Sequence, residues 1–188
     1  IKKDNVALIL GDNFFYGQSL TNKLEKALLH KIGARIFLKD VKTPENFGVA
    51  KIINNKIQKI IEKPKKFISS YAITGLYFFD NKVINFAKKL KPSKRGEIEI
   101  TDILDYYKNS KNLYYEHLGR GAIWSDAGKI EDMTNISAFV ESVEKVQSIK
   151  IACLEEIALS KKWISKKKIL ENINFYGNCN YSNYLKKL

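Results

Sequence analysis

The sequence has few of the residues that define disulfide-rich, metal-stapled or fibrous proteins. Its 188 residues include two cysteines and three prolines. Cys153 and Cys179 are isolated and show no CxxC spacing, so neither a zinc site nor a disulfide framework is indicated. We expect both to be packing residues in a reducing compartment. With 45% hydrophobic and 12% aromatic residues, the composition predicts one globular domain with a real core.

Long apolar runs are also absent. No window approaches the roughly 18 consecutive apolar residues of a membrane span, and no signal-peptide core follows residues 1–5. The sequence therefore predicts a cytoplasmic protein with no membrane partner.

Negative charge is scarce, and the formal net charge is +13. The excess is mostly lysine spread along the chain, which is typical of solvated helix faces rather than of a nucleic-acid footprint. A basic RNA-binding protein would instead cluster its basic residues beside exposed aromatic rings, whereas the aromatic residues here mostly fall inside apolar strands. We expect no nucleic-acid partner, although phosphate-bearing substrates would benefit from the positive field.

Regular hydrophobic patterns are present along most of the chain. The apolar run 6–10 has the character of a strand buried on both faces. A helix capped by Ser19 and stopped by Gly33 leads to a strand at 34–38, and this order predicts a right-handed crossover with parallel pairing. Further strands are expected at 48–53, 56–61, 71–79 and 113–118. Helices are expected after Asn81, at 98–107 and at 130–146, followed from about residue 155 by short helices anchored by Trp163, Phe175, Tyr181 and Tyr184.

One strand end carries a carboxylate suited to a metal ion. The run 6–10 stops at Gly11-Asp12, and ligands of open α/β sheets bind beyond the carboxyl ends of strands. Asp12 there supplies the hard oxygen ligands that Mg²⁺ selects. The alternative is that Asp12 only caps a turn.

A second carboxylate has the same setting far downstream. A short apolar stretch ends at Asp126, followed closely by Gly128. Two such carboxylates, each at a strand end, could meet in space.

Several motifs together carry a family resemblance. In order and spacing, the chain is similar to the bacterial glucose-1-phosphate thymidylyltransferases, a family of sugar nucleotidylyltransferases. The matching blocks are 11–17 (GDNFFYG), 44–49 (PENFGV), 62–64 (EKP), 71–80 (YAITGLYFFD), 90–93 (LKPS), 95–102 (RGEIEITD), 119–121 (GRG), 124–126 (WSD) and 155–158 (EEIA).

The resemblance implies an α/β fold: the Rossmann-like, mixed sheet flanked by helices of the nucleotide-diphospho-sugar transferases. It implies a nucleotidyltransferase core over 1–147 and a helical segment over 148–188 that serves oligomerisation or regulation.

The implied reaction is nucleotidyl transfer. A glucose 1-phosphate oxygen attacks the α-phosphate of dTTP and gives dTDP-glucose and pyrophosphate, a step in dTDP-sugar synthesis. By resemblance, Asp12 and Asp126 hold Mg²⁺, and Lys63 grips the sugar phosphate as a flexible point charge. Without the family, Lys63 would be taken for an exposed turn residue.

The resemblance also places a sugar pocket. Glu62 and Gly48 match positions that hold the hexose, since a carboxylate accepts from hydroxyl groups and a glycine admits the ring closely. The strand beneath the sugar is matched by Thr74, Gly75 and Tyr77, although core packing is the alternative for Tyr77. Trp124 lies near the metal in the family and could be purely structural.

One family feature is missing from this sequence. The glycine-rich loop and the first strands that bind the nucleotide triphosphate do not occur, so we expect the carboxyl-terminal part of a thymidylyltransferase, truncated at the N-terminus and without measurable turnover alone. The alternatives are a non-catalytic sugar-phosphate-binding relative, or a uridylyl or cytidylyl transferase, because base-reading residues fall largely in the missing part.

A regulatory site is the last implication of the resemblance. Tyr16, Gly17, Arg120 and Glu156 match a second nucleotide site between subunits of a homotetramer. An arginine frequent in the family is Ser160 here, and the loss of a bidentate phosphate partner weakens the expectation of feedback by dTDP-sugars.

Overall fold

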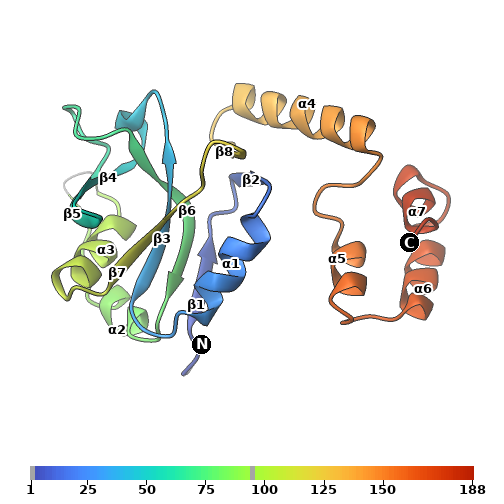
Figure 1. The fold of residues 1–188 in the computed structure, drawn as a ribbon, viewed down its shortest axis with the longest axis horizontal. Coiled ribbons are helices and arrows are strands. Elements are labelled where there is room, and N and C mark those ends of the chain that lie inside the picture. The colour runs from blue at the N-terminus through green and yellow to red at the C-terminus, as the bar shows by residue number, and fades with distance from the viewer. Residues whose placement is uncertain (1–2, 94–95) are drawn as a thin grey trace. The chain divides into compact units, whose positions relative to one another are not determined.

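The computed structural model describes residues 3–93 and 96–188. Arg95, which belongs to one of the matching blocks, lies outside the described residues. The chain forms two compact units, Ile1–Lys129 and Ile130–Leu188, which are described separately below (Figure 1). The expected domain boundary after residue 147 stays a prediction about function, whereas the compact units divide after Lys129.

The first unit is built on a six-stranded mixed sheet with the path β5-β4-β6-β3-β7, and β1 pairs with β6 off this path. Its strands are β1 (Val6–Ile9), β3 (Ala34–Asp40), β4 (Gly48–Ile53), β5 (Lys56–Glu62), β6 (Tyr71–Phe79) and β7 (Leu113–His117). Its helices are α1 (Leu20–Leu29), α2 (Val83–Ala87) and α3 (Ile100–Asn109), with a 3-10 turn at Pro44–Asn46. The expected hairpin at 48–61 and the strand at 71–79 are confirmed.

Strand β6 organises this sheet. β3 lies along one edge of β6, and the other edge is shared by two strands: β4 pairs at Ala72, and β1 pairs from Leu76 to Phe79. β1 and β3 are both antiparallel to β6, so they run parallel to each other but are not neighbours. The predicted direct pairing of these two strands is therefore wrong, because β6 lies between them.

β1 is also more exposed than its sequence predicts. The exposed fractions are 37% for Leu8, 57% for Ile9 and 40% for Leu10. Within the described residues β1 pairs only with β6, so its second edge carries no strand. Continuous apolarity correctly indicates a strand, but the expected burial on both faces is wrong for this chain.

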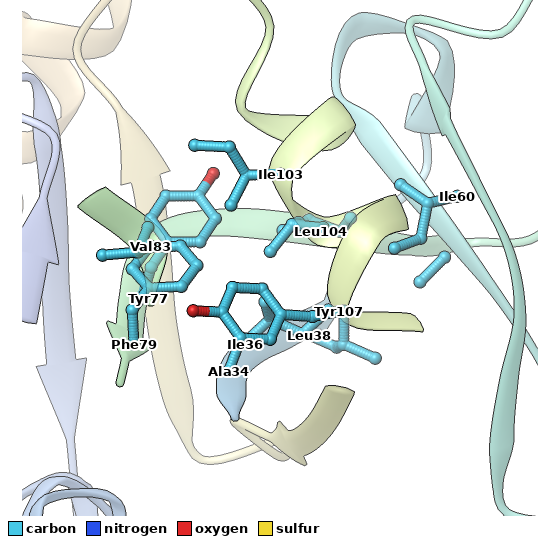
Figure 2. Close-up of a cluster of buried hydrophobic side chains, with 12 residues drawn as sticks. Ala34, Ile36, Leu38, Ile60, Tyr77, Phe79, Val83, Ile103, Leu104 and Tyr107 are labelled. Carbon is cyan, nitrogen blue, oxygen red and sulfur yellow. The ribbon is translucent and has the colours of Figure 1, made fainter. Parts of the chain in front are cut away.

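The sheet separates two hydrophobic clusters, because alternate residues of β3 point to opposite faces. Ile36 and Leu38 pack with Leu104 and Tyr107 of α3 and with Val83 of α2, as Figure 2 shows. Phe37, from the same strand, packs on the other face with Ala27 of α1 and with Leu76. Helices therefore cover both faces, as expected for the fold class.

A second, two-stranded sheet was only half predicted. β2 (Asn13–Gly17) pairs antiparallel with β8 (Ala122–Asp126), and Phe15 and Trp124 pack against the cluster under α1. The short strand ending at Asp126 was expected, whereas β2 was not assigned. This β2–β8 ribbon holds the candidate site.

The second unit is helical, with α4 (Ile130–Gln147), α5 (Leu154–Ser160), α6 (Lys166–Tyr176) and α7 (Asn180–Leu185). Its core consists of Cys153, Ile169, Ile173 and Leu185, with Tyr181 and Tyr184 packed against it. The helix expected at 130–146 is confirmed, but no residue of α4 is buried. No helix of the described residues is long and apolar enough to cross a membrane.

Several local expectations are wrong. Ser19 is the N-cap residue of α1 but makes no side-chain capping hydrogen bond. The N-cap of α2 is Lys82 rather than Asn81, whose amide donates to the Asp4 carbonyl. Trp163 and Phe175 are 75% and 85% exposed rather than anchors. Cys179 is exposed and caps α7 by accepting from the Ser182 backbone, whereas Cys153 is buried as expected.

Candidate functional site

The backbones of the two predicted metal ligands lie close together at one end of the β2–β8 ribbon. Asn13 lies directly opposite Asp126 in the antiparallel register, and Asp12 immediately precedes Asn13. The carbonyl oxygen of Asp12 accepts a 2.6 Å hydrogen bond from the Ala127 backbone N–H, so the backbone pairing continues one residue beyond Asn13 and Asp126. Residues that are 114 positions apart are thereby brought together, with Asp12 exposed and Asp126 half-buried.

Asn13 is the residue that ties this end of the ribbon to the main sheet. Its Oδ1 accepts from the Gly75 backbone N–H at 3.0 Å and from the Trp124 indole Nε1 at 2.7 Å. Its Nδ2 donates to Asp12 Oδ1 at 2.9 Å. The Asn13 side chain therefore joins three residues that the sequence prediction named separately.

A small cavity of about 330 Å³ lies on the neighbouring part of the sheet. It is lined by Ile60, Ile61, Glu62, Ser93, Glu99, Thr101, Asp102 and Asp105. Gly48 pairs with Glu62 across the β4–β5 hairpin, and a Cβ at Gly48 would lie 3.0 Å from Glu62 Oε2 and 3.1 Å from Thr101 Cγ2. The absence of a side chain at Gly48 thus gives the backbone close access to the carboxylate.

This cavity is rich in hydrogen-bond acceptors. Glu99 is buried and accepts from the Ser93 hydroxyl at 3.0 Å. Carboxylates accept from hydroxyl groups, so the lining suits a neutral polyhydroxylated ligand. Ser93, Glu99 and Thr101 were not selected from the sequence, although they fall inside or beside the matching blocks.

Lys63 follows Glu62 of the cavity and is connected to the ribbon through Phe47. Its N–H donates to the Phe47 carbonyl at 3.0 Å, and the Phe47 ring lies 4.9 Å from the Trp124 ring. Lys63 is exposed, and its φ of 40° places it in the left-handed region, which a lysine before a proline adopts only at a cost. Lys111 shares a positive φ, so this conformation alone does not identify a functional residue.

Two residues of β6 lie beneath the surface rather than on it. Thr74 is fully buried, and its hydroxyl donates to the Phe37 carbonyl at 3.0 Å. Tyr77 is buried in the core cluster with its ring stacked on Phe79. Burial raises the pKa of Tyr77, and the negative charge of Glu62 raises it further, so the Tyr77 hydroxyl stays protonated. The Glu62 carboxylate is therefore close enough to act on Tyr77 electrostatically.

The residues expected to bind a regulator fall in two groups. Tyr16 and Gly17 pair with Ile123 and Ala122 at the opposite end of the β2–β8 ribbon, and Arg120 is in the loop just before β8. A Cβ at Gly17 would lie 2.7 Å from Ala122 Cα, so only glycine fits there. Glu156 belongs to the second unit, where it accepts from the Tyr184 hydroxyl at 2.5 Å.

The donor set at the ribbon end fits a hard divalent cation only in part. Among the described residues, no group of three or more His, Cys, Asp or Glu side chains could hold a metal ion. Two carboxylates are the usual protein share of a magnesium site whose other ligands are water and substrate phosphates. Asp12 and Asp126 are the carboxylates at this ribbon end, and residues 3–93 and 96–188 offer no closed, all-protein metal cage.

The comparisons with known proteins agree with this geometry. A family model described as nucleotidyl transferase matches residues 1–143. This chain belongs to the nucleotidyl transferase family.

Its relatives include named thymidylyltransferases. The glucose-1-phosphate thymidylyltransferase of Neisseria meningitidis serogroup A is 44% identical over 189 residues, which are 100% of this chain and 66% of the relative. The enzyme of the same name from Mycobacterium tuberculosis is 38% identical over all of this chain and 65% of its own length. The chain thus spans somewhat less than two thirds of these relatives.

Solved structures share the fold. A Bacillus anthracis protein assigned as a glucose-1-phosphate thymidylyltransferase, crystallised with a sucrose, superposes with a TM-score of 0.65 at 43% identity over 73% of this chain and 55% of that one. A UDP-glucose pyrophosphorylase complexed with UDP-glucose gives a TM-score of 0.62 at 21% identity over 76% of this chain and 58% of that one, which is a likeness of fold. The expected fold class is confirmed.

Proposed function

We propose that this chain carries the sugar-phosphate-binding and metal-binding parts of a glucose-1-phosphate thymidylyltransferase. The observation that carries the proposal is the register of the β2–β8 ribbon, which pairs Asn13 with Asp126 and brings the Asp12 backbone to Ala127, the residue after Asp126. A contact path from that pair through Asn13, Trp124 and Phe47 leads to Lys63. Phosphoryl-group chemistry is mostly positioning and charge neutralisation, which these residue types supply.

The sugar side of the proposal rests on the cavity beside β5. Glu62 accepts hydrogen bonds from hexose hydroxyls, and Gly48 lets the ring approach the strand. We add Thr101 to this pocket, because its side chain lines the same cavity and lies beside Gly48, where a Cβ would come within 3.1 Å of Thr101 Cγ2. By the family resemblance we assign Thr74, Gly75 and Tyr77 to the strand beneath the sugar and Trp124 to the sugar side, where its ring contacts Phe47.

The phosphate side of the proposal rests on Lys63, Asp12 and Asp126. The Lys63 ammonium binds the phosphate of glucose 1-phosphate as a point charge. Asp12 and Asp126 are the residues that would hold Mg²⁺. When bound, the ion would supply charge neutralisation to the dTTP phosphates. The sugar phosphate oxygen attacks the α-phosphate, and pyrophosphate is the leaving group.

A two-part experiment tests this function. Titrating glucose 1-phosphate into the purified chain should give saturable binding by NMR or calorimetry, and Lys63→Ala or Glu62→Ala should abolish it. The chain should then be fused to the amino-terminal segment of the Neisseria meningitidis relative that it does not match, and pyrophosphate release from dTTP and glucose 1-phosphate should be measured. Absence of sugar-phosphate binding in the first part would contradict the proposal.

A non-catalytic sugar-phosphate-binding protein is the second candidate, favoured by the cavity and Lys63 alone. The fusion decides between the two, because a binding protein would bind glucose 1-phosphate yet release no pyrophosphate. Replacing dTTP by UTP or CTP in the same assay identifies a uridylyl or cytidylyl transferase. The homotetramer and the regulatory role of Tyr16, Gly17, Arg120 and Glu156 stay predictions, which sedimentation and titration of a dTDP-sugar would test.

A further inference from the structure

The hydrogen-bond ladder along β6 is interrupted at the point where β6 changes partners. β4 pairs with β6 at Ala72, and β1 begins its pairing at Leu76. Between them, the Gly75 carbonyl accepts from the Leu10 backbone at 2.9 Å, but the Gly75 N–H donates to no strand backbone among the residues that the structure describes. A buried backbone donor must find a partner, and here the partner is the Asn13 side chain.

Gly75 is needed for this arrangement because the Asn13 amide lies directly against it. A Cβ at Gly75 would lie 2.6 Å from both Cγ and Oδ1 of Asn13 and 2.7 Å from Nδ2. The fit also fixes which way the amide faces. Both neighbours of Oδ1 are N–H donors, and the neighbour of Nδ2 is a carboxylate oxygen, so a flipped amide would lose all three hydrogen bonds.

The held amide in turn restrains two groups of the candidate site. Its Nδ2 donates to Asp12 Oδ1, which leaves the second carboxylate oxygen of Asp12 to face a ligand. Its Oδ1 accepts from Trp124, which fixes the indole that packs on Phe47. Partners of this kind, which orient a ligating carboxylate, have a large effect on metal affinity.

We infer that Asn13 is a positioning residue: a single amide held against Gly75 orients the Asp12 carboxylate for the metal ion and the Trp124 ring that packs on Phe47. The inference rests on the proposed function, since it assumes that Asp12 is a metal ligand. It extends that function by naming Asn13 as the residue whose side chain holds both Asp12, the proposed metal ligand, and Trp124, on the sugar side.

The test measures the dissociation constant of Mn²⁺ alone for the 188-residue chain, from the electron paramagnetic resonance signal of free Mn²⁺. Asn13→Ala should raise this constant by about 10- to 100-fold, because Asp12 loses its restraint. Gly75→Ala should raise it in the same direction without changing the chemistry of Asn13, and it keeps the test available if Asn13→Ala folds poorly.

Leu104→Ala is the matched control. Leu104 is fully buried in the core on α3, so its truncation destabilises the chain without touching the ribbon. Measured well below every unfolding midpoint, Leu104→Ala should leave the Mn²⁺ dissociation constant unchanged. A general loss of stability would move the constant in Leu104→Ala as well.

A second readout uses the fluorescence of Trp124. The chain has two tryptophans, and replacing the exposed one by Trp163→Phe leaves Trp124 as the single emitter. Asn13→Ala in that background should shift the emission maximum, because the indole N–H loses its acceptor, whereas Leu104→Ala should not.

The outcomes separate this inference from the proposed function. If Asp12→Asn leaves Mn²⁺ binding intact, or if the unaltered chain binds no Mn²⁺, the metal site itself is wrong. If Asp12→Asn abolishes binding but Asn13→Ala and Gly75→Ala bind Mn²⁺ like the unaltered chain, the positioning role is overturned while the metal site stands. A Leu104→Ala effect as large as that of Asn13→Ala would overturn it too.

Discussion

Asp12 in the first unit and Glu155 in the second are both carboxylates held by hydrogen bonds, yet their surroundings differ in kind. Asp12 is exposed, and one of its oxygens accepts from Asn13. Glu155 is buried and accepts from the hydroxyls of Tyr176 at 2.8 Å and Tyr181 at 2.5 Å and from the Asn172 amide at 3.3 Å.

The difference is the one expected between a proposed ligand site and a structural hydrogen-bond hub. Both carboxylate oxygens of Glu155 accept hydrogen bonds from side chains of α6 and α7. These hydrogen bonds join α5 to the other two helices. Asp12 is oriented by one donor and stays accessible, which is what a metal ligand requires. The number of internal donors and the exposure, rather than the residue type, distinguish the two roles.

The largest expected effect is on catalysis. In the fused enzyme described above, Asp126→Asn or Asp12→Asn should lower kcat by about 10²- to 10³-fold, the magnitude typical of losing one charge-stabilising group in an active site. Stability should change by less than about 0.5 kcal/mol. Glu131→Gln, at an exposed carboxylate of α4, is the control. Equal activity of Asp126→Asn and Glu131→Gln would show that the ribbon end is not catalytic.

The next effect is on the stability of the second unit. Glu155→Ala should destabilise it by about 3 kcal/mol, because two tyrosine hydroxyls and an amide lose a charged acceptor. Hydrogen exchange of the α5, α6 and α7 amides measures the loss. Glu171→Ala is the matched control, since that carboxylate is half exposed and only pairs with Lys168. A similar loss of stability in Glu155→Ala and Glu171→Ala would show that the hydrogen bonds of Glu155 have no special structural role.

Acidification should act on Glu155 through the same hydrogen bonds. Burial alone would raise its pKa, but donation from Tyr181, Tyr176 and Asn172 outweighs burial and lowers the pKa below the ordinary value of 4.5. The carboxylate therefore contributes stability above pH 4.5, and this contribution is lost as the pH falls from 4.5 through the lowered folded-state pKa. Urea unfolding at pH 7 and below pH 4 should show the loss, and Glu155→Gln should flatten it.

The smallest effect concerns backbone strain at Lys63. Lys63→Gly should stabilise the first unit by about 1 kcal/mol, because glycine adopts a positive φ without steric cost. It should also abolish glucose 1-phosphate binding. Lys111→Gly is a close control: this lysine has a φ of 59°, so the variant should gain similar stability and keep binding. Chemical denaturation and the binding titration give both values. Loss of binding in both variants would point to net charge rather than to Lys63.

The sequence predicted the strands better than their environments. Continuous apolarity located β1, and the Asn54-Asn55 turn between two runs located the β4–β5 hairpin, because both signals are local. The exposure of β1 depends on what lies at its second edge, which its own residues do not encode. β2 was missed because its residues FFYG follow neither a strand nor a helix period clearly.

The same limit applies to the site. Asp12 and Asp126 were found because each ends an apolar stretch, and the resemblance supplied Lys63 and the sugar pocket. Asn13 was not found, since its role depends on the Gly75 N–H that becomes available only where β4 and β1 share the edge of β6. Thr101 was missed for a similar reason: its contact with Gly48 crosses from α3 to β4.

The central claim is that Asp12 and Asp126 hold one divalent cation together. Anomalous diffraction at the manganese edge from crystals of the chain grown with Mn²⁺ and glucose 1-phosphate tests it most directly. The account predicts one anomalous peak between the two carboxylates, with the sugar phosphate at Lys63. A peak that contacts only one of the two carboxylates, or sugar-phosphate density away from Lys63 and Glu62, would contradict it.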